Sequence, residues 1–234
     1  LALGLPFGVD MTDNSRGAMI KARGFDGGQA DYYAHYGLLD YGPIYAGKGV
    51  NLLPHEYALL AERDARLAVV PTLRFFDAQG VPVHDFLAAG ILPGLGTDAP
   101  LVSDSQDPFE AMRHAIFTQN MAVKARVAAG GERPDAALWL NAERCIEMAT
   151  LGGARSLLME DTCGSLEVGK SADLIMIDVS RAEIAPTWDD RRLLGSLVWG
   201  GKGTQVHSSF VAGERLIADG RSTRWDEEEV IREA

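Results

Sequence analysis

Charged side chains follow several short apolar stretches of this sequence, and they are the first candidates for chemistry. They are Asp10, Asp13, Lys48 and Asp98. Carboxylates bind divalent metals or transfer protons, and a lysine can stabilise a developing negative charge. If the stretches that precede them end at one place in the fold, the four side chains predict a reaction centre there.

Each candidate also has a purely structural interpretation. Asp98 could cap the helix that follows it. Asp10 and Asp13 could form a surface turn with a helix cap, and Lys48, between two glycines, could be a solvent-exposed loop residue. The five histidines have no ligand-like partner two or four residues away, so we expect structural roles for them.

Elements that could gather these residues recur along the first part of the chain. Four apolar runs are each followed by a helical pattern, and they span residues 1–9, 42–50, 66–72 and 91–97. Runs without alternation predict strands buried on both faces, and strands that alternate with helices predict parallel βα units. Four units fit half of an eight-unit barrel or a small doubly wound sheet. In both folds ligands bind at the carboxyl ends of the strands.

The pattern changes after about residue 130. A helical stretch at 134–159 is expected to break at Gly152 and Gly153. Two hairpins are then expected, one over 164–178 that turns at Gly169-Lys170 and one over 206–221 that turns at Gly213. Because Gly169-Lys170-Ser171 falls inside the first hairpin, we interpret it as a turn and not as a phosphate-binding loop. A charged helix is expected at the end of the chain.

These patterns predict an α/β protein with two regions. Residues 1–160 are expected to form the βα region, and residues 161–234 a small β module with a tail helix.

Composition limits the class of partner. The chain has 234 residues, 47% of them hydrophobic, and a net charge of −11, so a sizeable core is expected and neither nucleic acid nor an anionic membrane surface is a favoured partner. No apolar run reaches the length of a membrane span. Only two cysteines are present, which excludes a disulfide framework and favours a reducing compartment, hence the cytoplasm. A small-molecule substrate is the expected partner.

Three stretches resemble a known family. They are GLLDYGPIYAGKGVNLLPHEYALLAERDARLAVVPT, LPGLGTDAPLVSD and EMATLGGARSLLMEDTCGSLEVGKSADLIMID. They are similar to the amidohydrolase superfamily, in the branch of cytosine, guanine and S-adenosylhomocysteine deaminases and triazine hydrolases. The most specific piece, residues 148–178, is a signature of the scaffold and not of catalysis.

The resemblance implies a fold and a reaction. The fold is a (β/α)8 TIM-type barrel with a small β-sandwich, of which this chain would supply about strands five to eight and the C-terminal part of the sandwich. The reaction is deamination or hydrolysis at a C–N bond of a nitrogen heterocycle, in which water activated by a zinc or iron ion attacks a ring carbon and expels ammonia or another leaving group. The first half of such a barrel, with two metal-binding histidines, would lie outside these residues.

Residue roles follow from the same resemblance. Asp98 matches an aspartate that binds the metal and takes a proton from its water, and Ser103 matches a serine of the same loop that contacts substrate. Asp10 stands where the family has a metal-binding histidine, and Asp13 stands where it has a proton-shuttling glutamate. The resemblance thus implies Asp98 and Asp13 as catalytic residues and Asp98 and Asp10 as metal ligands.

The chain departs from the family at further positions. Lys48 stands in place of a histidine, and Arg74 and Phe75 replace polar residues, so Lys48 and Arg74 are predicted to contact substrate. A lysine here opposes metal binding unless it pairs with a nearby carboxylate such as Asp98 or Asp10. Of everything that the resemblance implies, the divalent metal, zinc or iron, therefore agrees least with these residues.

Three functional hypotheses remain open at this stage. The first is an amidohydrolase-type hydrolase of C–N bonds. The second is a catalytically silent relative in which Lys48 takes the metal position and the protein binds a ligand or a partner subunit. The third is one subunit of a split enzyme, in which a partner chain supplies the other half-barrel; a homo-oligomer is also expected.

Overall fold

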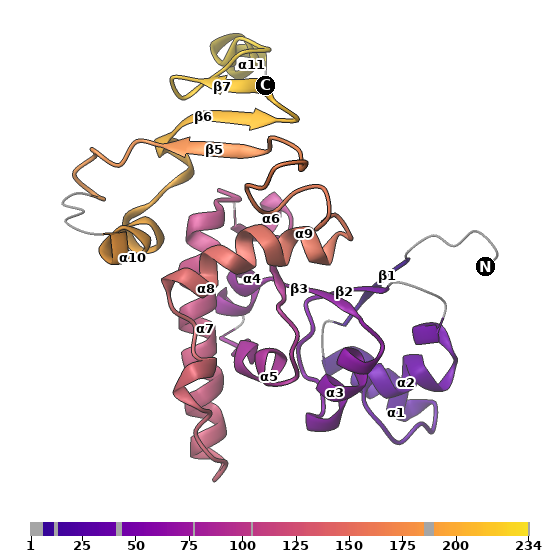
Figure 1. The fold of residues 1–234 in the computed structure, drawn as a ribbon. Coiled ribbons are helices and arrows are strands. Elements are labelled where there is room, and N and C mark those ends of the chain that lie inside the picture. The colour runs from indigo at the N-terminus through magenta and orange to yellow at the C-terminus, as the bar shows by residue number, and fades with distance from the viewer. Residues whose placement is uncertain are drawn as a thin grey trace.

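The computed structural model describes residues 7–11, 14–40, 44–76, 78–103, 105–184 and 190–233. A parallel sheet with helices packed against it occupies the first part of the chain, and an antiparallel sheet lies beyond it (Figure 1). The parallel strands are β1 (Phe7–Asp10), β2 (Ile44–Gly47), β3 (Arg66–Val69) and β4 (Gly94–Leu95).

The four parallel strands lie side by side in chain order, β1-β2-β3-β4. A doubly wound sheet reverses its strand order at a switch point, whereas a barrel adds each strand beside the last. The four described strands show no such reversal. Among the strands that the structure describes, the sheet does not close on itself. The four predicted βα units are confirmed, although β4 is shorter than the apolar run at 91–97.

Helices cover the parallel sheet. Those of the βα region are α1 (Asn14–Ala22), α2 (Gln29–His35), α3 (Pro54–Glu62), α4 (Pro71–Phe76), α5 (Val83–Ala88), α6 (Pro100–Ser103) and α7 (Pro108–Ala128). Alternate strand residues such as Leu67 and Val69 are buried against this layer, where they pack with Leu60 and Phe86. The core thus lies between the sheet and its helices.

Helix caps explain several boundaries. The Asp107 side chain accepts from the Phe109 N–H at 2.9 Å, and Pro108 occupies the first turn of α7, where its missing N–H costs nothing. The buried Glu56 carboxylate accepts N–H bonds from Leu53 at the start of α3 and from Ala30 at the start of α2, both at 2.6 Å. One side chain therefore holds two helix N-termini together, where a negative charge is favoured.

The segment at 142–156 is one nearly continuous helix. It consists of α8 (Ala142–Glu147), a π-helical turn (Met148–Gly152) and α9 (Gly153–Ser156). The expected break at Gly152 and Gly153 is wrong, because both residues keep right-handed helical dihedral angles. Gly152 allows close packing, described below.

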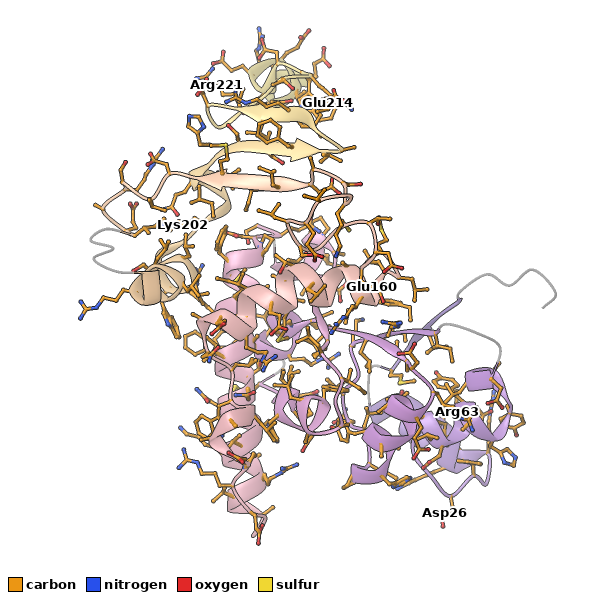
Figure 2. The ribbon with its side chains drawn as sticks, viewed as in Figure 1. Asp26, Arg63, Glu160, Lys202, Glu214 and Arg221 are labelled. Carbon is orange, nitrogen blue, oxygen red and sulfur yellow. The ribbon has the colours of Figure 1, made fainter. Side chains whose placement is uncertain are left out.

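The antiparallel sheet has the order β5-β6-β7-β8, with β5 (Leu174–Ile177), β6 (Val206–Val211), β7 (Glu214–Ala218) and β8 (Arg221–Ser222). The hairpin that turns at Gly213 is confirmed, with φ +82° at that glycine. The hairpin over 164–178 is wrong: the residues before β5 form turns, Leu166 and Val168 are exposed, and β5 pairs with β6. In Figure 2 the labelled Glu214 and Arg221 lie on this sheet, far from Arg63 of the βα region.

Two further helices complete the C-terminal region. The helix α10 (Asp190–Gly200) packs on α7 and α8, and α11 (Glu227–Glu233) is the expected charged tail helix. Among the described helices, none is long and apolar enough to cross a membrane.

Candidate active site at the carboxyl ends of the parallel strands

Three of the predicted residues meet at one edge of the parallel sheet. Asp10 ends β1, Lys48 directly follows β2, and Asp98 lies three residues after β4. The Lys48 Nζ atom is 3.7 Å from Asp10 Oδ2 and 3.4 Å from Asp98 Oδ2. The expected convergence is therefore observed, while the chemical role of each residue stays a prediction.

The backbone at this edge adopts conformations that side chains disfavour. Lys48 has φ +72° and Asp98 has φ +64°, both in the left-handed region. Such residues cost free energy and cluster at functional sites. The Lys48 N–H donates to the Ala68 carbonyl at 2.7 Å, which extends the pairing of β2 with β3 and fixes where the lysine starts.

Asp98 does not cap the helix α6 as an N-cap residue would. Its Oδ1 atom accepts from the adjacent Ala99 N–H at 2.8 Å, before the helix begins at Pro100, and its Oδ2 atom faces Lys48. A capping side chain would instead accept from the second or third helical residue. The carboxylate therefore faces the sheet edge.

A hollow of about 380 Å³ opens beside these charges, on the sheet face opposite the helices. Small side chains line much of it, including Gly8, Gly47, Ala68 and Gly96, so the strand ends leave space for a small molecule.

Tyr45 lines the same hollow and was missed by the sequence analysis. Burial raises the pKa of its phenol, and the negative charges of Asp10 and Asp98 raise the pKa further. The phenol therefore stays protonated and can donate a hydrogen bond. A signal was present, because Tyr45 stands two residues before Gly47 in β2, and residues two apart in a strand share a face.

The remaining predicted residues are placed as follows. Arg74 is buried in α4, where its guanidinium donates to Gln79 Oε1 at 3.1 Å, and its contact with substrate stays a prediction. Ser103 ends α6, in the loop that follows Asp98, but its side chain is outside the described part of the chain. Asp13 also lies outside the described residues.

The arrangement was tested against a divalent metal. Within the described ranges, no three His, Cys, Asp or Glu side chains are grouped so that they could hold one. The two carboxylates that the resemblance implied as ligands instead share the Lys48 ammonium. Zinc would need ligand oxygens at about 2.0–2.2 Å, and a cationic amine beside the same oxygens opposes it. These residues, as arranged, do not fit a metal.

The contacts of His114 agree with the structural role expected for it. The His114 Nδ1 atom lies 3.1 Å from Thr72 Oγ1, and the ring stacks on Phe75 with centroids 4.6 Å apart. Burial lowers the pKa of His114, so its ring is neutral at neutral pH.

Close packing at the other end of β4 positions the strand that leads to Asp98. The Ser156 hydroxyl accepts from the Gly94 N–H at 3.1 Å and donates to backbone carbonyls of Leu67 or Gly152. A Cβ atom on Gly152 would lie 2.7 Å from the Pro93 carbonyl oxygen, so a glycine is needed there. The Gly152-Gly153 pair, here called the GG motif, thus lets the helical segment pack on the sheet, and it forms no phosphate loop.

Ion pairs add to the same junction. Arg66, at the start of β3, donates to Glu160 at 2.8 Å, and Glu160 follows α9 (labelled in Figure 2).

Comparisons with known proteins agree with this architecture. Residues 15–216 match the family described as the amidohydrolase family. A 5-methylthioadenosine/S-adenosylhomocysteine deaminase of Moorella thermoacetica is 34% identical over 195 residues, which are 83% of this chain and 42% of that protein. An S-triazine hydrolase of Gordonia rubripertincta is 31% identical over 86% of this chain and 39% of that protein.

Solved structures show the same fold. An adenosine deaminase from Xanthomonas campestris, solved with bound zinc, superposes with a TM-score of 0.82 at 25% identity over 99% of this chain and 50% of that chain. An atrazine chlorohydrolase from Arthrobacter aurescens superposes with a TM-score of 0.82 at 19% identity, over 99% of this chain and 48% of that chain. This chain therefore spans about two-fifths of the curated relatives and about half of the solved chains.

Proposed function

Because this chain belongs to the amidohydrolase family, we propose that the protein is a hydrolase that cleaves a C–N bond of a small nitrogen heterocycle. The observation that carries the proposal is the convergence of Asp10, Lys48 and Asp98 beside a hollow of about 380 Å³. Relatives named deaminase and triazine hydrolase support the substrate class.

The proposed architecture goes beyond the open sheet. We assign β1 to β4 as strands five to eight of a (β/α)8 barrel and β5 to β8 as part of a β-sandwich, with the division near residue 160. The sequential order of parallel strands and the superposition on longer chains support this assignment. Four more strands, in the same polypeptide or in a partner chain, would close the hollow.

Two aspartates carry the proton transfers of the proposed reaction. Asp98 accepts a proton from water as the water oxygen bonds to the carbon that carries the amino group. The C–N bond then breaks with its electron pair on nitrogen, and Asp98 returns the proton to the departing nitrogen, so that ammonia leaves and the carbon keeps the oxygen. Asp13, by the family resemblance, shuttles protons in the same step.

Two more groups act on the charge that develops in this reaction. The Lys48 ammonium lies beside the base and can stabilise negative charge on the attacked ring. The protonated Tyr45 phenol lines the same hollow and can donate a hydrogen bond to substrate. Both groups are held by strand β2 and the residue after it, so they need little reorganisation during the reaction.

One observation favours a second candidate function. The Lys48 ammonium partly neutralises the carboxylates that a hydrolase would use, and a relative without catalysis could keep this cluster as a binding site for a ligand or a partner subunit. The two functions differ in whether turnover occurs.

The test is ammonia release by the full-length protein from a panel of aminopurines, aminopyrimidines and aminotriazines. Replacement of a general base is expected to reduce kcat/KM at least about 100-fold, and Asp98→Asn should do so. The matched control is Asp64→Asn, because Asp64 also has a positive φ, +48°, but lies at the opposite end of β3, where it pairs with Arg66. No release from any compound, or full activity in Asp98→Asn, would contradict the proposed function.

A further inference from the structure

Lys48 is placed by packing and not by its own charge. Its Cα position is held by the bond from its N–H to Ala68 and by the next residue, Gly49, which has φ +52°. A Cβ atom on Gly49 would lie 2.8 Å from side-chain atoms of both Leu67 and Phe86, so the backbone here sits directly on the core. The lysine therefore leaves the sheet from a rigid point.

The side chain then crosses the sheet face that borders the hollow. Asp10 belongs to the neighbouring strand β1, but Asp98 follows β4, and β3 lies between β2 and β4. The 3.4 Å contact with Asp98 passes over β3, which presents the small Ala68 to the hollow. The ammonium is thus bound from two sides, with 22% of the lysine side chain exposed.

Stability does not explain this arrangement. Ion pairs that are partly exposed contribute little to stability, and the Asp10 side chain is 42% exposed. Two residues with disfavoured positive φ, Lys48 and Asp98, form the pair at its centre. A strained and weakly stabilising cluster beside a hollow is the pattern of a functional site.

We propose that the Lys48 ammonium is a built-in cation that takes the place of a metal ion between Asp10 and Asp98, so that this site works without a bound metal. This inference rests on the proposed hydrolase function and names the cation that the function uses. The ammonium supplies one positive charge and three donors, so it orients both carboxylates and leaves donor capacity for a substrate atom.

Substitutions of Lys48 should change metal binding in opposite ways. A histidine at position 48 removes the fixed charge and adds a neutral imidazole, which is a good zinc ligand beside two carboxylates. A methionine at position 48 keeps the chain length, removes the charge and adds no hard ligand. Lysine itself should exclude the metal, histidine should admit it, and methionine should abolish the function of the cation.

The experiment measures metal content in the full-length protein after removal of metals with a chelator and reloading with zinc or iron. We expect the unchanged protein to retain less than about 0.1 equivalent and Lys48→His to take up at least about 0.5 equivalent, since deprotonated ligands create the site. Ammonia release by the unchanged protein should survive the chelator. Lys48→Met should lose at least about 100-fold in kcat/KM, as expected for loss of a charge-stabilising donor.

Controls separate folding and general charge effects. Lys124→Met removes an exposed lysine of α7 and should change neither readout. Circular dichroism and the urea midpoint show whether each variant folds. One equivalent of metal in the unchanged protein, metal-free Lys48→His, or undiminished turnover in folded Lys48→Met would each overturn the proposal.

The two proposals fail in different ways. Metal content needs no substrate, so it decides the role of Lys48 even when no compound of the panel releases ammonia. Turnover that requires an added metal would overturn the built-in cation and leave the hydrolase function standing.

Discussion

The adjacent glycines of the GG motif have opposite predicted responses to the same substitution. Both lie in right-handed helical backbone, so an alanine suits the dihedral angles of either one. A Cβ atom on Gly152 would lie 2.7 Å from the Pro93 carbonyl oxygen and 3.4 Å from that of Glu147. On Gly153 the nearest atom would be the Met148 carbonyl oxygen at 3.9 Å, an ordinary contact. Gly152→Ala should destabilise the protein, and Gly153→Ala should not.

The pair isolates the cost of the close contact. Gly→Ala in a helix interior gains about 0.5–1 kcal/mol, and this gain is common to both variants. Overpacking against groups that cannot rotate away costs about 1–3 kcal/mol, and it applies to Gly152 alone. The Gly153→Ala variant should therefore be more stable than the Gly152→Ala variant by about 1–3 kcal/mol. We expect the upper part of that range, because the atoms that face position 152 are backbone carbonyl oxygens, which cannot rotate away.

Thermal unfolding of the full-length variants measures the difference. For a protein of this size about 2–4 °C corresponds to 1 kcal/mol, so the two Tm values should differ by roughly 2–12 °C. The displaced contact also borders β4, which leads to Asp98, so Gly152→Ala should lower kcat/KM more than Gly153→Ala. Equal Tm values, or a more stable Gly152→Ala variant, would refute the packing argument.

Other groups give further tests. Glu56→Ala leaves buried helix N–H groups without their acceptor and should cost about 3–5 kcal/mol in urea unfolding, and a loss below about 1 kcal/mol would contradict the capping role. Burial raises the pKa of the Cys145 thiol to about 12. A thiol reagent at mildly alkaline pH should therefore label only Cys163 in the folded protein and both cysteines after unfolding. Rapid labelling of both cysteines in the folded protein would contradict the burial of Cys145. Burial lowers the pKa of His84, so the folded state binds fewer protons than the unfolded state. The free energy of unfolding should therefore fall as the pH drops below about 6.5. This one residue can contribute at most about 1.4 kcal/mol per pH unit to that fall. His84→Gln should flatten that part of the curve of urea midpoint against pH, and an unchanged slope would show that other groups cause it.

Errors in the sequence analysis have identifiable causes. Gly152 and Gly153 were expected to break a helix, because glycine weakens an isolated helix, but the Pro93 carbonyl oxygen packs so closely on Gly152 that a small residue is favoured there. A turn was placed correctly near Gly169, with φ +101°, yet the strand expected before it is absent, because β5 finds its partner in β6.

The position of a side chain around a helix was also beyond the sequence. Arg74 follows β3 by only a few residues and was predicted to contact substrate. By that point the chain has entered α4, and the helical rotation turns the guanidinium toward Gln79. Tyr45 was missed for a different reason. In the sequence it looks like one more apolar residue of a strand, and only the alternation of side chains along β2 places it in the hollow.

The sequence by itself determined the alternation of buried strands and helices, and with it the gathering of Asp10, Lys48 and Asp98 at one sheet edge. This follows because parallel strands joined by helices must end on the same side. Only the tertiary structure decided how these charges pair. The reach of Lys48 across β3 to Asp98 depends on the placement of the small Ala68 between them and on the left-handed backbone at both residues, neither of which a linear pattern specifies.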